Sequence, residues 1–163
     1  MYKRQHELLY FSKGEVDEAA EAPPIHQAVV RRQGRDITCI AYSQMLPLAL
    51  QAAEQLATEG IELTIIDPRS LSPIDWETCA RSVEQTHRCL IVEEDCRFAG
   101  AGAEFAATLQ ERCFYLLDAP IRRVAGLDLP TPFNGTLEAA SIPRVEDIVL
   151  AARQIMTPPG ESA

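Results

Sequence analysis

Two kinds of segment alternate along this chain. Short runs of consecutive apolar residues predict strands over residues 28–31, 37–42, 61–66, 89–92 and 121–124. Longer segments, in which apolar residues recur every three or four positions, predict helices over residues 46–57, 72–85, 100–113 and 145–156. Gly60 ends the first of these helices, and a Ser-Pro pair at residues 72–73 begins the second.

This alternation of strands and helices is typical of βαβ units and a mainly parallel sheet. The central strands are apolar without interruption, as expected when helices cover both faces. We therefore predict a three-layer α/β/α sandwich with a mainly parallel five-stranded sheet. Because turn-forming residues occupy positions 33–36, the first two strands could form a hairpin, with the first at a sheet edge.

The domain pattern begins only after a proline pair at residues 23–24. Before it, an apolar patch over residues 8–11 precedes an acidic stretch, so residues 1–26 resemble an arm or linker. An apolar patch in that position suggests packing on something upstream. We expect one domain over residues 27–156 and a polar tail over residues 157–163.

Composition restricts the classes of partner. The chain has 163 residues, 47% of them hydrophobic, and a formal net charge of -9. That acidity argues against nucleic acid and anionic membrane surfaces, both of which attract clustered Lys and Arg. No stretch resembles a signal peptide or a membrane span, so we expect a cytoplasmic protein.

The cysteines are odd in number and none are spaced as C-x-x-C, so neither a disulfide framework nor a zinc site is expected. Their apolar neighbours favour buried thiols in a reducing compartment. The five are Cys39, Cys79, Cys89, Cys96 and Cys113.

Three segments follow predicted strands, where ligands of parallel sheets usually bind: residues 42–44, 67–70 and 93–97. The last contains Glu93, Glu94, Asp95 and Arg97. These carboxylates could hold a cation, act in acid–base chemistry or meet a basic partner. A partner interface is favoured over a metal, and a solvated loop with Asp95–Arg97 pairing is as reasonable as the interface.

The glycines at positions 100 and 102 could cradle a phosphate at a helix start. They lack the third glycine of a dinucleotide fingerprint and the P-loop Lys-Ser/Thr pair, and carboxylates precede them. Close helix–strand packing is the favoured interpretation.

Catalytic chemistry has little support in the sequence. No nucleophile motif surrounds the three histidines (His6, His26, His87) or the strand-end serines Ser43 and Ser70. Trp76 is expected in the core or as an interface anchor. We predict no catalytic, cofactor-binding or metal-binding residue.

An ordered set of motifs carries a family resemblance. The segments are ITCIAYS at 37–43, IIDPRSLSPID at 65–75, VEED at 92–95, GAGAE at 100–104, LDAPIRRV at 117–124, D-x-P-x-P at 128–132 and IP-x-x-x-DI at 142–148. In this order, over roughly residues 7–156, the chain resembles the C-terminal domain of the beta subunit of 2-oxo acid dehydrogenases (pyruvate, branched-chain 2-oxo acid and acetoin). This domain is related to the C-terminal domain of transketolase.

The resemblance implies a parent enzyme that decarboxylates a 2-oxo acid, or cleaves acetoin, with thiamine diphosphate and Mg, and passes the acyl group to lipoamide. Those cofactors would bind a pyrimidine-binding domain, to which the arm leads, and the alpha subunit. Neither is present here, so the chain is expected to be a fragment or a truncated reading frame, inactive and binding no cofactor.

The implied partners are a second copy of this domain, the alpha subunit and the subunit-binding domain of the acyltransferase. Acidic docking groups of the family map onto Asp118, for which an end cap is an equal alternative. Three other interpretations stay open: a small enzyme using residues 93–102, a flavodoxin-like nucleotide-binding module, and the equivalent domain of a transketolase-type enzyme.

Overall fold

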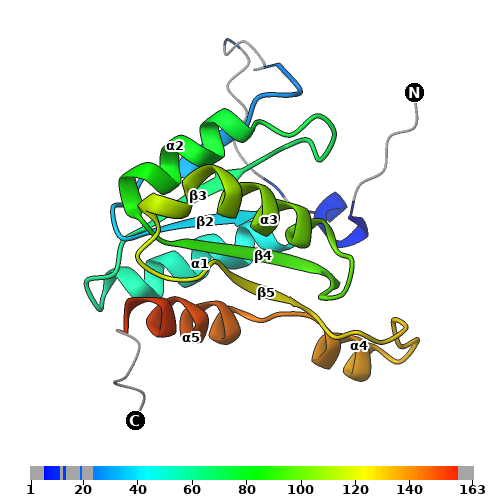
Figure 1. Ribbon diagram of the computed structural model, residues 1–163. Helices are drawn as coiled ribbons and strands as arrows, with labels where there is room; N and C mark the ends of the chain where they lie inside the picture. The colour runs from blue at the N-terminus through cyan, green and yellow to red at the C-terminus, as the bar shows by residue number, and fades with distance from the viewer. Residues whose placement is uncertain (1–5, 12, 14–18, 20–23, 158–163) are drawn as a thin grey trace.

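Five strands form one sheet in the order β1-β3-β2-β4-β5 in the computed structural model, which describes residues 6–11, 13, 19 and 24–157 (Figure 1). The strands are β1 (Val29–Arg32), β2 (Ile37–Ala41), β3 (Leu63–Asp67), β4 (Cys89–Cys96) and β5 (Arg122–Gly126). The neighbours β3, β2, β4 and β5 pair in parallel, and β1 pairs with β3 in the antiparallel direction. The predicted five-stranded, mainly parallel sheet is confirmed.

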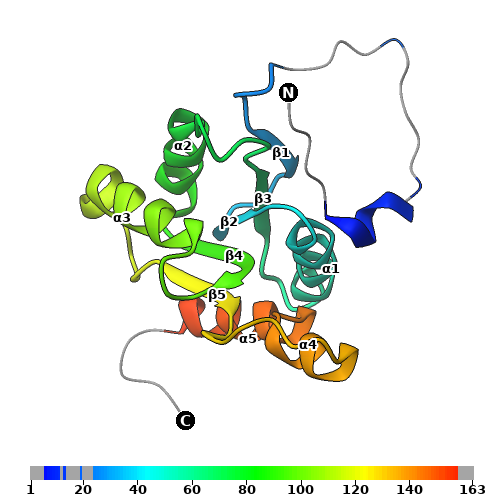
Figure 2. The same cartoon turned by 90° about the vertical axis from the view of Figure 1, so that its right-hand side faces the viewer.

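Helices cover both faces of this sheet, which confirms the three-layer arrangement (Figures 1 and 2). One layer contains α1 (Met45–Ala57) and α5 (Val145–Met156), and the other contains α2 (Trp76–Thr86) and α3 (Ala101–Cys113). Three shorter elements were not predicted: η1 (Glu7–Phe11), η2 (Phe114–Leu116) and α4 (Gly135–Ser141).

The two layers bury separate hydrophobic clusters because successive strand residues point to opposite faces. On β4, Leu90 packs with the α1 and α5 layer, whereas Ile91 packs with the α2 and α3 layer. On β2, Cys39 packs with the α1 and α5 layer, and Ile40 packs with the α2 and α3 layer. Every position of β2 and residues 89–93 of β4 are therefore buried, which explains the uninterrupted apolar runs of these strands.

The expected hairpin is wrong, although β1 does lie at the sheet edge. β1 pairs with β3 instead of β2, and the connecting residue Gly34 exchanges hydrogen bonds with the Thr64 hydroxyl. Arg31 also donates to the Asp67 carboxylate at the end of β3. Contacts to residues about thirty positions away therefore decide the strand order, and the turn residues do not.

Two element boundaries also differ from expectation. The second helix begins at Trp76, because the Asp75 carboxylate accepts the Thr78 N–H at 3.1 Å and caps it there. The fourth strand does not stop before the acidic cluster but continues through Cys96. The expectation of a loop over residues 93–95 is therefore wrong, and the reason lies in the contacts of Glu93.

Candidate functional site

Glu93 lies at the centre of a buried polar network at the carboxyl end of β4. Its side chain is 0% exposed. Arg123 on β5 donates to its Oε1 from Nε at 3.1 Å and from Nη2 at 2.5 Å. The Tyr42 hydroxyl and the Gly102 N–H donate to Oε2 at 3.1 and 2.7 Å. Both carboxylate oxygens thus have donors, as a buried charge requires.

The two glycines at the start of α3 make room for this carboxylate. A Cβ on Gly102 would lie 2.2 Å from Oε1 of Glu93, and one on Gly100 would lie 2.4 Å from the Cys96 carbonyl oxygen. Close helix–strand packing is therefore confirmed. A carboxylate of the chain itself occupies the helix start, which leaves the Gly102 N–H unavailable to a phosphate.

Tyr42 acts in this network as a hydrogen-bond donor. Burial, reinforced by the negative charge of Glu93, raises the pKa of Tyr42 well above its usual value. The phenol therefore stays protonated at physiological pH. The network joins Tyr42 after β2, Glu93 on β4 and Arg123 on β5, and each oxygen of the carboxylate accepts two hydrogen bonds from within the chain.

The other acidic residues of the segment point to different partners. Oε2 of Glu94 lies 3.1 Å from Nε2 of His6, in the N-terminal arm. Burial raises the pKa of Glu94, while the charge of His6 and a hydrogen bond from Ser43 oppose that rise. The exposed Asp95 accepts the N–H of Cys96 at 2.8 Å. Glu93, Glu94 and Asp95 therefore do not form one cluster.

Arg97 fixes the strand end by two hydrogen bonds. Its Nη1 donates to the Arg123 carbonyl at 2.9 Å, and its N–H donates to the Gly126 carbonyl at 3.2 Å. These contacts replace the expected pairing with Asp95. Asp95 and Arg97 remain exposed, whereas Glu93 is not available to a partner.

Asp118 lies at the opposite end of the sheet, before β5. Its carboxylate is 3.3 Å from Nη2 of Arg88, and its N–H donates to the His87 carbonyl at 2.9 Å. The side chain is 54% exposed. Asp118 is therefore a surface acid whose charge Arg88 partly compensates.

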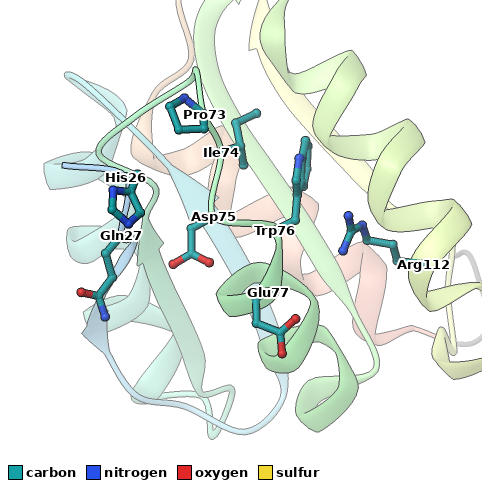
Figure 3. A pocket seen from close by; sticks show the side chains of 8 residues that line it. All are labelled: His26, Gln27, Pro73, Ile74, Asp75, Trp76, Glu77 and Arg112. Atoms are coloured by element: carbon teal, nitrogen blue, oxygen red, sulfur yellow. The ribbon is translucent and has the colours of Figure 1, made fainter. Parts of the chain in front are cut away.

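A cavity of about 480 Å³ borders Trp76, and none of its lining residues belongs to the Glu93 network (Figure 3). The Trp76 ring packs edge-on against Phe105 at 5.3 Å, and the Arg112 guanidinium lies 5.9 Å from its centroid. Asp75, which also lines the cavity, accepts hydrogen bonds from Thr78 and from the Ala28 N–H. Sequence reasoning missed this cavity, because α2 and the residues just before it, α3 and the segment before β1 together form its lining.

Two features of the described residues bear on metal binding and thiol chemistry. These residues contain no group of three or more His, Cys, Asp or Glu side chains able to hold a metal ion. Four cysteines are buried, and burial raises the pKa of Cys39 and Cys79 to about 12. Among the described residues, no helix combines the length and the hydropathy that a membrane span requires.

Curated relatives are beta subunits of pyruvate dehydrogenase. The chain is 42% identical over 154 residues to "Pyruvate dehydrogenase E1 component subunit beta-2, mitochondrial" of Oryza sativa subsp. japonica, covering 92% of this chain and 41% of that protein. It is 38% identical over 151 residues to "Pyruvate dehydrogenase E1 component subunit beta" of Rickettsia felis, covering 93% and 46%. The chain thus spans less than half the length of these relatives.

The fold matches a solved structure described as "Split gene transketolase, inactive beta4 tetramer", with a TM-score of 0.69 and 27% sequence identity. The match covers 88% of this chain and 45% of that one. The sequence also matches the family described as "Transketolase, C-terminal domain" over residues 26–148. The chain therefore belongs to the transketolase C-terminal domain family.

Proposed function

We propose that this chain is the C-terminal domain of the beta subunit of a thiamine diphosphate-dependent 2-oxo acid dehydrogenase. The observation that carries the proposal is the 42% identity, over 92% of the chain, to a pyruvate dehydrogenase beta subunit. The parent enzyme would decarboxylate a 2-oxo acid and pass the acyl group to lipoamide. We place it in the cytoplasm and assign residues 1–26 to an arm, 27–156 to the domain and 157–163 to a tail.

We assign this domain to assembly instead of catalysis. Hydrogen bonds within the chain saturate the buried Glu93, and the same carboxylate occupies the start of α3, where a diphosphate would bind. The described residues also lack a cluster for a divalent cation. We therefore propose that thiamine diphosphate and Mg bind in the parts of the parent enzyme outside this chain.

The proposed partners are a second copy of the domain, the alpha subunit and the subunit-binding domain of the acyltransferase. A net charge of -9 favours a basic partner domain. Asp118 is the proposed docking residue because its carboxylate is exposed. Arg88 competes for that carboxylate, so the contribution of Asp118 should be modest and sensitive to salt.

Calorimetric titration with the acyltransferase subunit-binding domain tests this docking. We expect Asp118→Asn to weaken binding by up to about fivefold, the range for one exposed charge pair. Glu54→Gln is the matched control, because it removes the same charge from an exposed position on α1. Equal affinities for the two variants would refute docking through Asp118.

A further inference from the structure

The cavity beside Trp76 places opposite charges on either side of an apolar surface. Its volume of about 480 Å³ lies within the range of small-molecule sites. Trp76 and Ile74 are half-buried and line it with apolar atoms. In Figure 3 the Trp76 side chain lies between the Asp75 carboxylate and the Arg112 guanidinium. We call this site the Trp76 cavity.

Arg112, near the end of α3, forms the positive side of the Trp76 cavity. Its guanidinium lies 5.9 Å from the centroid of the Trp76 ring. Within the described part of the chain, no carboxylate forms an ion pair with it. A guanidinium can donate two parallel hydrogen bonds to a carboxylate. Arg112 is therefore able to bind the carboxylate of a ligand.

Glu77 and Asp75, at the start of α2, form the negative side. Oε1 of Glu77 accepts a hydrogen bond from Arg81 at 3.2 Å, and Oε2 accepts none from the described residues. Burial favours the neutral form of Asp75, but hydrogen bonds from Thr78 and from the Ala28 N–H hold the pKa of its carboxyl below the usual value. Asp75 is therefore a carboxylate at neutral pH, and a ligand ammonium can pair with Oε2 of Glu77 beside it.

A ligand with a single charge would meet repulsion from one side of the cavity. An anion bound to Arg112 lies near Asp75 and Glu77, and a cation bound to these carboxylates lies near Arg112, because all three residues line the same cavity. A molecule that carries both charges avoids this repulsion. Its apolar part would cover Trp76, whose ring packs edge-on against Phe105 at 5.3 Å.

We propose that the Trp76 cavity binds an apolar amino acid or dipeptide in its zwitterionic form. The ligand carboxylate pairs with Arg112, its ammonium pairs with Glu77, and its apolar side chain packs on Trp76. Free amino acids and dipeptides share this chemistry and differ in the distance between their two charges. The inference goes beyond the assembly role and does not depend on it, since neither Asp118 nor the Glu93 network lines this cavity.

Fluorescence titration of the full chain tests the proposal, because Trp76 is its only tryptophan. The probes are phenylalanine, the dipeptide leucyl-phenylalanine and two analogues of phenylalanine that each lack one charge. Phenethylamine lacks the carboxylate, and 3-phenylpropionate lacks the ammonium. We expect phenylalanine or the dipeptide to change the Trp76 emission saturably and to bind about fivefold more tightly than either analogue, the range for one exposed charge pair. The zwitterion that binds more tightly identifies the source of the ligand, and calorimetry measures each affinity independently.

Two variants assign the charges. Arg112→Met should weaken the binding of phenylalanine about fivefold and should not weaken that of phenethylamine, which has no carboxylate to pair. Glu77→Gln should weaken the binding of phenethylamine and should not weaken that of 3-phenylpropionate, which has no ammonium. Arg153→Met is the matched control, because it removes the same charge from α5 in the other helix layer, and every affinity should stay unchanged.

Three outcomes overturn the inference. If no probe changes the Trp76 emission or releases heat up to its solubility limit, the cavity is not a binding site for this class of ligand. Equal affinities for phenylalanine, the dipeptide and both analogues would show that the charges take no part in binding. If Arg112→Met weakens phenylalanine and phenethylamine equally, Arg112 shapes the cavity without binding a carboxylate. Because the chain is measured without any partner, each of these outcomes leaves the proposed function standing.

Discussion

Replacing Arg123 by methionine would leave a buried carboxylate without its positive partner. Glu93 is 0% exposed and would keep only the Tyr42 hydroxyl and the Gly102 N–H as donors. Breaking one side of a buried ion pair typically costs about 3–5 kcal/mol. That is a large share of the ~5–15 kcal/mol by which small domains are stable.

Equilibrium unfolding in urea, followed by Trp76 fluorescence and by circular dichroism, measures this loss. With a slope of about 2 kcal/mol per molar urea, the midpoint should fall by about 1.5–2.5 M. Arg153→Met is the matched control, because Arg153 also donates two hydrogen bonds from Nε and Nη2 to one carboxylate, that of Glu59 at the surface. Exposed pairs often contribute nothing measurable, so the control midpoint should not move.

A loss of less than about 1 kcal/mol for Arg123→Met, or one equal to that of the control, would mean that Arg123 does not stabilise a buried charge on Glu93. It would mean that water or a rearranged side chain compensates the carboxylate. The ion pair between Glu93 and Arg123 would then not be what holds β4 and β5 together at this point of the sheet.

Three further outcomes follow from the same structure. Gly102→Ala places a Cβ 2.2 Å from Oε1 of the buried Glu93 and should lower the free energy of unfolding in urea by about 1–3 kcal/mol. In the control, Gly135→Ala, the Cβ meets nothing within 4 Å, so the free energy of unfolding should not fall. Equal losses for the two variants would contradict this packing. Burial raises the pKa values of Cys39 and Cys79 to about 12, so iodoacetamide at about pH 8 should alkylate these thiols only after urea unfolds the chain. Alkylation of either thiol in the folded protein would contradict their burial. Burial raises the pKa of Glu94 above its usual 4.5, so at a pH just above 4.5 the folded protein keeps a proton on Glu94 that the unfolded chain loses. The free energy of unfolding should therefore fall as the pH rises from about 4.5 through the pKa of Glu94 in the folded protein. Glu94→Gln should flatten that slope in urea midpoints measured against pH, and an unchanged slope would show that another group causes it.

Local patterns were enough to predict the layers of the fold. The apolar run at residues 89–92 and the helical period at residues 145–156 each match an element of the predicted type. The order of the strands could not be predicted from neighbouring residues in the sequence, because contacts between distant residues position β1. The ion pair between Arg31 and Asp67 is one of these contacts. Adjacent segments with a turn between them suggested a hairpin that these contacts override.

The candidate site was only partly predictable for the same reason. A Glu-Glu-Asp run indicates a solvated loop when it is considered alone. Glu93 is nevertheless buried, because Arg123 lies thirty positions further along the chain and compensates its charge. The glycines at 100 and 102 did signal close packing, but nothing in the sequence indicated that a carboxylate would fill the space they leave.

The most direct test of the assembly role is sedimentation equilibrium of the purified chain, alone and with the acyltransferase subunit-binding domain, at about 0.05 M and 0.5 M salt. The Debye length shortens severalfold across that range, so a charge-based complex should weaken. We expect a dimer that binds the partner domain, with affinity falling as salt rises. A chain that stays monomeric at all concentrations and sediments independently of the partner would contradict the assembly role.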